Sequence, residues 1–517
     1  MFTLVAQWPF VLTQKRWLMT IAPYLFLTLF ALPLLAINLP TYPPIWFDEG
    51  YKTHAARLLA ERGFYGSCTV SGCLPFDPGI SSGPADIGTV ALSFILFGIG
   101  IWQARLPSIL FTLVAIGSGY ALTKRIFGAP TAFISMLLLM AFPPMNGISF
   151  LLIGRQALGE MPAMALILLG LWAWVMSLNR TTARWQWMLF SGIAMGVGLL
   201  SKTQIAIALV PALLLIGLGR LLLRQDRIIS AFTPSALTVA IVAGWSLLGR
   251  LLTPEPARSD NAAMLAEALR TNLITDLFGR NLNRTAWLML LIMGLGITSS
   301  LWHMRDHLRN RTITNRDWAE LTLVLFTFST MIWFAFLSIG WPRYAFAGLT
   351  IGLILNGALI TSVVSHLMTV LRKRFPRASQ YLPLLIILIL MGAALLINGI
   401  HIAIYSHDHL AIDVGQYINQ TIPRDAIIES WEWELDALTE HRRFHHPHQR
   451  YLFLAIRQFS HGHKAFDLGY DTLEADPDYL ISGPYSEWIH IYNPLTIQRS
   501  FQPIAHIGAY TIYQRVR

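Results

Sequence analysis

Charged side chains are scarce in this sequence. Asp, Glu, Lys and Arg make up 13% of its 517 residues, whereas hydrophobic residues make up 54% and the mean hydropathy is +0.52. Soluble domains carry charge at about a quarter of their positions, so this balance excludes an ordinary soluble protein. The apolar residues form long uncharged runs, several of which reach the roughly 20 residues that a membrane-spanning helix needs. These runs include residues 17–39, 187–200, 205–218, 229–248, 321–337 and 382–405.

Two further scarcities narrow the class of protein. The sequence has no Gly-x4-Gly-Lys-Ser/Thr loop, so no energy-coupling nucleotide site of that type is expected. It also has only two cysteines, Cys68 and Cys73. In an oxidising compartment such a pair closes a small hairpin, and we predict a structural disulfide rather than a metal site.

Lys and Arg are concentrated in short breaks between the apolar runs, and the net charge is +10. The positive-inside rule explains this pattern better than a nucleic-acid partner and places the breaks in the cytoplasm. We therefore expect a cytoplasmic N-terminus, a retained signal-anchor as first span, about 11 to 12 spans in all and an external C-terminus. The breaks contain Lys15 and Arg16, Lys124 and Arg125, Arg180 and Arg184, Arg220, Arg224 and Arg227, residues 305–316 and residues 372–377.

One apolar segment, residues 87–102, does not fit a simple crossing. If it spanned the membrane, Lys124 and Arg125 would fall outside and residues 155–160 inside, against the charge rule. We favour a helix that re-enters the membrane or lies at its interface. The alternative is a true span whose flanking charges follow the positive-inside rule only weakly.

The chain changes character near residue 405. Residues 1–405 are predicted to form an all-α polytopic membrane domain, with a large first external loop at about 39–104. The polar residues 406–517 are predicted to form a small extracytoplasmic α/β domain, because strand-like and helix-like segments alternate there. The expected strands are 425–430, 478–482 and 504–515, and the expected helices are 434–441 and 451–459.

An acidic pair, Asp48 and Glu49, follows the first span. Apolar residues at helical spacing after the pair predict a helix along the membrane surface, with Asp48 at its N-terminus. Helix capping explains an acid at that position, and a general base is the sharper alternative because partial desolvation raises the basicity of a carboxylate. A second acid, Glu160, also stands where an external loop enters a helix, and capping explains it equally well.

Two cations occupy external turns where the charge rule disfavours them, Lys202 and Arg343. Snorkelling to lipid headgroups is one explanation. Binding a phosphate group at the membrane surface is the other, since Arg offers a fork of donors and Lys a compact charge. Two acids and two cations at one membrane face are consistent with a shared site, in which Asp48 and Glu160 would hold a divalent cation or divide base and orienting roles.

The order of short motifs resembles that of the GT-C glycosyltransferases, specifically the bacterial family 39/83 group of protein mannosyltransferases and aminoarabinose transferases. Each motif alone is weak, but together they extend over about 350 residues on one predicted face. They are Asp48-Glu49 with Tyr51, Ser82-Gly83-Pro84, Phe97-Gly98, Arg105 to Ser108, Arg155 to Glu160, Gly198 to Lys202 and Arg343-Tyr344.

This resemblance implies an inverting glycosyltransferase in the inner membrane of a bacterial cell. Such an enzyme takes a sugar from a polyprenyl phosphate and passes it to a glycan, lipid or protein acceptor outside the cytoplasm. Asp48, with Glu49 and Glu160, would supply the catalytic carboxylates. Lys202, Arg343, Tyr344 and Arg155 would bind the donor phosphate, whose charge grows as it leaves.

The sequence departs from the family pattern at Glu160, where many relatives carry Asp, so a divalent cation is possible rather than required. Two other functions are consistent with the sequence. A polysaccharide polymerase or ligase would also use external Arg residues, and a secondary transporter would place its ionisable residues near the middle of the membrane.

The C-terminal domain offers two further patterns. Its aromatic residues are expected mostly in the core, with stacking on sugars as the alternative. Four histidines superficially resemble a metal cluster, but their Arg- and Pro-rich surroundings predict a solvated loop. The aromatic residues are Trp431, Trp433, Tyr485, Trp488 and Tyr492, and the histidines are His441, His445, His446 and His448.

Overall fold

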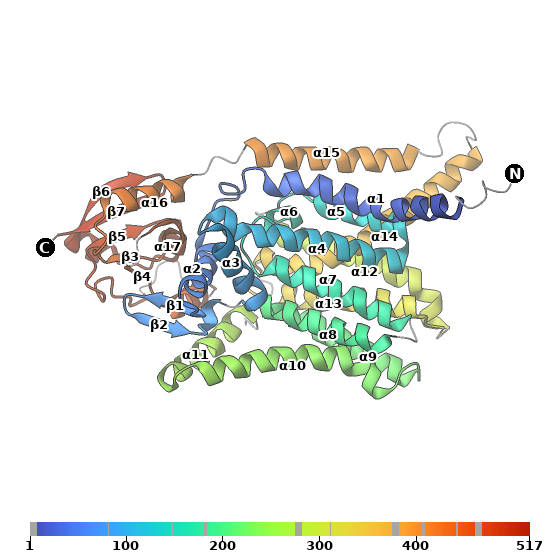
Figure 1. The fold of residues 1–517 in the computed structure, drawn as a ribbon, viewed down its shortest axis with the longest axis horizontal. Coiled ribbons are helices and arrows are strands. Elements are labelled where there is room, and N and C mark those ends of the chain that lie inside the picture. The colour runs from blue at the N-terminus through green and yellow to red at the C-terminus, as the bar shows by residue number, and fades with distance from the viewer. Residues whose placement is uncertain are drawn as a thin grey trace.

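The computed structural model describes residues 8–80, 82–145, 148–179, 183–273, 282–310, 312–374, 382–404, 409–440, 443–460 and 468–516. Within them, eight helices are long and apolar enough to cross a membrane. They run roughly parallel in one bundle, and a domain of strands and short helices lies at one end of it (Figure 1). The eight are α4 (Ile101–Phe127), α7 (Glu160–Leu178), α9 (Ala206–Leu222), α10 (Ile228–Leu252), α12 (Arg284–Arg309), α13 (Asn315–Phe336), α14 (Phe346–Arg374) and α15 (Leu382–Ile404).

Three more helices lie alongside the eight: α1 (Trp8–Ala36), α5 (Ala129–Ala141) and α8 (Arg184–Ser201). The predicted all-α membrane domain is therefore confirmed. Of the 11 to 12 spans expected from the sequence, eight in the described part of the chain meet the length and hydropathy requirement. The remaining short elements are α6 (Phe150–Ile153), α11 (Glu255–Ala268) and the single turns η1 (Pro78–Ile80), η2 (Thr203–Ile205), η3 (Leu269–Leu273) and η4 (Pro342–Ala345).

Close helix packing in the bundle depends on small residues. A Cβ atom on Gly170 of α7 would lie 2.5 Å from Cγ of Met195 and 3.0 Å from the carbonyl oxygen of Ser191, both on α8. Only glycine allows this approach, which is typical of membrane helix interfaces. By contrast α15 exposes Leu385, Ile389, Leu390 and Leu396 on its outer side, as a lipid-facing helix does.

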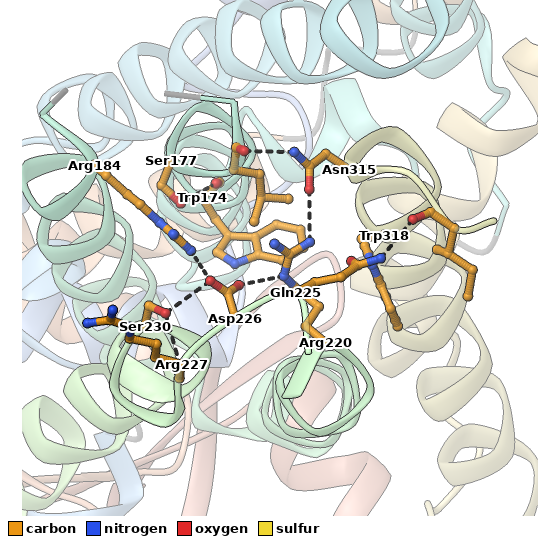
Figure 2. Close-up of polar contacts among 12 residues, drawn as sticks. Trp174, Ser177, Arg184, Arg220, Gln225, Asp226, Arg227, Ser230, Asn315 and Trp318 are labelled. Carbon is orange, nitrogen blue, oxygen red and sulfur yellow. Dashed lines mark hydrogen bonds and ion pairs between the residues drawn. The ribbon is translucent and has the colours of Figure 1, made fainter. Parts of the chain in front are cut away.

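A cluster of polar side chains connects several helices at the end of the bundle farthest from the strand domain (Figure 2). Asp226 forms ion pairs with Arg184 and Arg220, and the Arg220 Nε–Asp226 Oδ2 distance is 2.7 Å. Arg220 also donates a hydrogen bond to Oδ1 of Asn315, 3.0 Å away, and Asn315 donates to the carbonyl oxygen of Leu178. These contacts connect α7, α8, α9 and α13. Arg184 and Arg220, two of the cations predicted in cytoplasmic breaks, therefore have a structural role here.

The first loop folds into a compact unit at the strand-domain end of the bundle. It contains α2 (Phe47–Arg62), the hairpin β1 (Gly66–Thr69) and β2 (Gly72–Pro75), and α3 (Pro84–Phe97). The Cys68–Cys73 disulfide closes the hairpin, as expected. The 14 residues of α3 extend about 21 Å, less than the roughly 30 Å of a bilayer core. Helix α4 begins at Ile101, so residues 87–102 are divided between a short non-spanning helix and the first turn of the next span.

The C-terminal domain contains a five-stranded sheet in the order β4-β3-β5-β7-β6. Strands β4, β3 and β5 pair in parallel, whereas β5, β7 and β6 pair antiparallel. The single final strand predicted at 504–515 is wrong: Gly508, with φ +58°, allows a turn that divides it into a hairpin. The elements are α16 (Leu410–Thr421), β3 (Ile428–Ser430), α17 (Trp433–Leu438), β4 (Phe444–His445), α18 (Arg450–Ser460), β5 (Tyr479–Ser482), α19 (Pro484–Ile489), α20 (Pro494–Ser500), β6 (Phe501–Ile507) and β7 (Tyr510–Arg515).

The predicted solvated histidine loop is wrong at two positions. His445 and His446 are buried, because β4 pairs with β3 and brings them to acidic partners. His445 Nδ1 lies 2.5 Å from Oε2 of Glu429, and His446 Nε2 lies 3.8 Å from Oδ2 of Asp436. His441 lies outside the described residues.

The prediction that the domain's aromatic residues are buried is confirmed for three of the five. Trp431, Trp433 and Tyr492 are buried. Trp488 is exposed and Tyr485 is half-buried, so these two remain available to a ligand.

Candidate active site

Four of the predicted site residues meet in one ion cluster where the membrane bundle joins the C-terminal domain. Arg343 forms an ion pair with Oδ2 of Asp48, and its Nε lies 3.1 Å from Oε1 of Glu160. Nζ of Lys202 lies 2.8 Å from the same Glu160 oxygen. The cluster therefore joins side chains from α2, α7, the α8–η2 turn and η4.

Neither acid in the cluster caps its helix. The N-cap of α2 is Trp46 and that of α7 is Gly159, and neither makes a side-chain capping hydrogen bond. Asp48 and Glu160 lie inside the first turns, and their carboxylates are directed to cations instead. The capping explanation is therefore wrong for both side chains.

Glycine brings the elements of the cluster together. A Cβ atom on Gly159 would lie 2.0 Å from the carbonyl oxygen of Ser201, so only glycine lets the start of α7 touch the end of α8. This contact places Glu160 beside Lys202. Glu160 is 2% exposed, and a buried carboxylate is stable only when cations surround it.

Helix α2 is not a surface helix, which corrects the interface-lying helix predicted after Asp48. Eleven of its 16 residues are buried. A Cβ atom on Gly50 would lie 2.2 Å from the backbone nitrogen of Glu434 on α17, so the C-terminal domain packs directly against it. Arg57 donates hydrogen bonds of 3.0 Å to the carbonyl oxygens of Asp436 and Thr439 in the same domain. The C-terminal domain thus fixes the helix that carries Asp48.

The cluster forms part of the wall of a cavity of about 1060 Å³. Asp48, Lys202, Arg343 and Tyr344 all line it. Other walls come from α10, α11, α18 and the segment after β2, so both the membrane domain and the C-terminal domain enclose the space. Nζ of Lys202 lies 5.9 Å from the ring centre of Tyr344, and this cation–π contact orients the ammonium group.

Lys52 is a cavity residue that sequence reasoning did not select. It lies one helical turn after Asp48, and this i, i+4 spacing was the available signal. Its Nζ lies 3.5 Å from Oδ2 of Asp86 on α3, and both side chains are buried. Burial raises the pKa of Asp86, while the Lys52 charge opposes that rise.

The structure does not bring Glu49 or Arg155 into the cluster. Both oxygens of Glu49 bind Arg105, at 3.0 and 2.6 Å, and Oε1 also accepts a hydrogen bond from the backbone nitrogen of Ala157. Arg155 donates hydrogen bonds to the carbonyl oxygens that end α1 and begin the first loop, including one of 2.6 Å to Leu34. Both residues are buried and hold the backbone of the site in place.

The arrangement does not fit a bridging metal ion. Arg343 stands between Asp48 and Glu160, and a cation shared by the two carboxylates would have to displace its guanidinium. Among the described residues, no three His, Cys, Asp or Glu side chains are arranged to hold a metal.

Comparisons with known proteins show what the sequence and the fold resemble. The family model for dolichyl-phosphate-mannose-protein mannosyltransferase matches residues 89–247. A comparison with curated proteins found no significant match. Among solved structures, ArnT from Cupriavidus metallidurans bound to undecaprenyl phosphate is 16% identical with a TM-score of 0.66, over 96% of this chain and 98% of that one.

A second similar structure is the archaeal oligosaccharyltransferase AglB from Archaeoglobus fulgidus, in complex with an inhibitory peptide and a dolichol-phosphate. It is 13% identical, with a TM-score of 0.59, over 98% of this chain and 75% of that one. The chain therefore has the GT-C type of membrane fold that these two structures share, and its residues 89–247 match a mannosyltransferase family model.

Proposed function

We propose that this protein transfers a sugar from a polyprenyl phosphate to an acceptor hydroxyl, with inversion at the anomeric carbon. The observation that carries the proposal is the contact of Arg343 with both Asp48 and Glu160 in the wall of a cavity of about 1060 Å³. The proposed base, Asp48, thus lies in one cluster with the proposed phosphate-binding cations Arg343 and Lys202. The related fold of ArnT, solved with undecaprenyl phosphate, supports a lipid phosphate as the donor.

In the proposed reaction Asp48 accepts the proton of the acceptor hydroxyl while that oxygen attacks the anomeric carbon. The bond from this carbon to the phosphate oxygen breaks, and the polyprenyl phosphate leaves with the electron pair. A single displacement of this kind inverts the anomeric configuration. Lys202 and Arg343 stabilise the charge that develops on the phosphate, so they bind the transition state more strongly than the bound donor.

Glu160 keeps the two cations in position. Its Oε1 contacts Lys202 and Arg343 together, so neither can turn away from the cavity without leaving a buried carboxylate unpaired. Lys52 adds a third positive charge to the cavity wall. We further propose that the protein lies in a bacterial plasma membrane with the site and the C-terminal domain outside the cytoplasm, as the basic breaks indicate.

The test uses the purified full-length protein in lipid nanodiscs with radiolabelled undecaprenyl phosphate sugars of several kinds. We expect one donor to be consumed, with label appearing in product and free undecaprenyl phosphate released. NMR of the product should show the anomeric configuration opposite to that of the donor. Consumption of nucleotide sugars but of no lipid-linked donor, or a product of retained configuration, would contradict the proposal.

A further inference from the structure

A second cavity, of about 420 Å³, lies beside the first. Phe47, the residue before Asp48, lines both cavities. The second cavity is enclosed by the segment between α1 and α2, the start of α16, the β3–α17 connection, α19 and the β6–β7 turn. It therefore lies where the membrane bundle meets the C-terminal domain, and the donor chemistry described above makes no use of it.

Aromatic side chains form much of its wall. Trp46 and Trp488 line the cavity and remain 38% and 48% exposed, so part of each side chain is accessible to a ligand. Tyr485 continues this surface, with its ring centre 5.9 Å from that of Trp488 and 3.7 Å from that of Phe47. Rigid aromatic faces combined with a few polar groups are typical of small-molecule sites, and the apolar faces of sugar rings stack on them.

Two buried carboxyl groups, Glu432 and Glu434, supply polar atoms to the same cavity. Glu432 accepts hydrogen bonds from the backbone nitrogens of Tyr485 and Ser486, at 3.2 and 2.8 Å. The Tyr510 hydroxyl donates to Oε1 of Glu434 at 2.9 Å. Burial, followed by the charge of Glu432, raises the pKa of Glu434 well above its ordinary value, which favours the protonated carboxyl group. A ligand rich in hydroxyl groups matches this mixture of donors and acceptors.

Tyr485 connects this cavity with the ion cluster. Its hydroxyl oxygen is buried and has no hydrogen-bond partner among the described residues. Burial, followed by the charges of Asp48, Glu432 and Glu434, raises the pKa of this hydroxyl group. The aromatic wall also reaches the cluster, because the Trp46 ring lies 5.2 Å from the Arg343 guanidinium carbon. A ligand in the second cavity would therefore extend toward Asp48.

We propose that the second cavity binds the saccharide part of the acceptor, with sugar rings against Trp46 and Trp488 and hydroxyl groups hydrogen-bonded to Glu434 and Tyr485. This proposal rests on the transferase function above, because it assigns the acceptor side of that reaction. A hydrocarbon chain is the competing occupant. It would leave the buried Tyr485 hydroxyl without a hydrogen-bond partner, whereas a sugar hydroxyl group would supply one.

The test measures saccharide binding to the full-length protein in nanodiscs by saturation-transfer difference NMR. The probes are neutral trisaccharides of glucose, mannose, galactose and N-acetylglucosamine. The variants are Trp488→Ala, Trp488→Phe as the conservative replacement, and Trp102→Ala as a matched control, since Trp102 is also an exposed tryptophan near this end of the bundle but lines neither cavity. Because Trp488 is 48% exposed, its replacement is expected to leave folding intact.

We expect at least one trisaccharide to bind, with affinity reduced about tenfold in Trp488→Ala, partly restored in Trp488→Phe and unchanged in Trp102→Ala. Asp48→Asn should still bind the saccharide, which separates this proposal from the catalytic one. Equal binding by Trp488→Ala and wild type, or no binding of any trisaccharide, would overturn the saccharide site. Neither result would bear on the transferase function, which donor turnover tests independently.

Discussion

Arg343 binds the carboxylate of Asp48, so the side chain predicted to hold the donor phosphate also holds the predicted base. It contacts Oδ2, one of the two carboxylate oxygens. In the proposed reaction, a donor phosphate would compete with Asp48 for the guanidinium and would leave Asp48 free to approach the acceptor. The proposal therefore links donor binding to the action of the base through one side chain.

Replacing Arg343 with lysine should lower kcat/KM for the donor by about 10²-fold. Lysine keeps the charge but offers a single compact contact, which cannot reach Asp48 and Glu160 together as the planar guanidinium does. Steady-state transfer assays measure this loss. Arg499→Lys, an exposed replacement in α20, is the control and should transfer sugar at the wild-type rate.

Replacing Lys52 with methionine should raise KM for the donor by about tenfold, because one cation leaves the cavity wall and buried Asp86 loses its partner. Lys52→Arg keeps the charge and should restore most of the affinity. Lys124→Met, at the opposite end of the bundle, is the matched control. Equal donor KM in the Met and Arg variants would show that the charge of Lys52 is irrelevant.

Replacing Glu49 with glutamine should mainly destabilise the protein. Arg105 is fully buried, and removal of its partner's charge from such a pair costs about 3–5 kcal/mol. The expected result is a lower unfolding temperature and a lower yield of folded protein in detergent, measured by tryptophan fluorescence on heating. An unchanged unfolding temperature combined with lost turnover would instead assign Glu49 a catalytic role.

Replacing Glu434 with glutamine should change how stability depends on pH. In the wild type the raised pKa of Glu434 means that the folded state keeps a proton that the unfolded state releases, so stability falls as pH rises above the ordinary glutamate value. Glutamine does not titrate and removes this fall. Between about pH 5 and pH 8 the unfolding temperature of the variant should rise by about 2–4 °C relative to wild type. Identical pH profiles would contradict the raised pKa.

The sequence predicted the parts of the fold that depend on local pattern. Long uncharged runs predicted the bundle, the Cys68–Cys73 spacing predicted the closed hairpin, and isolated charges in external turns predicted the residues that meet at Arg343. Each of these signals lies within one short segment, so no knowledge of tertiary packing was needed.

The sequence could not show which acids and cations pair, because pairing depends on contacts between distant segments. Glu49 and Asp48 are neighbours in sequence, yet one faces Arg105 and the other faces Arg343. For the same reason helix α2 looked like a membrane-surface helix. Its burial comes from the docking of α17, a segment almost 400 residues later.

Asp48→Asn gives the most direct test of the central claim that Asp48 removes the acceptor proton. The measurement compares sugar transfer from the labelled lipid donor, and binding of undecaprenyl phosphate, in the same nanodisc samples of wild type and variant, with Asp425→Asn as an exposed Asp control. The account predicts a fall in transfer of about 10² to 10⁴-fold with donor binding retained. A folded variant that transfers sugar at the wild-type rate would contradict it.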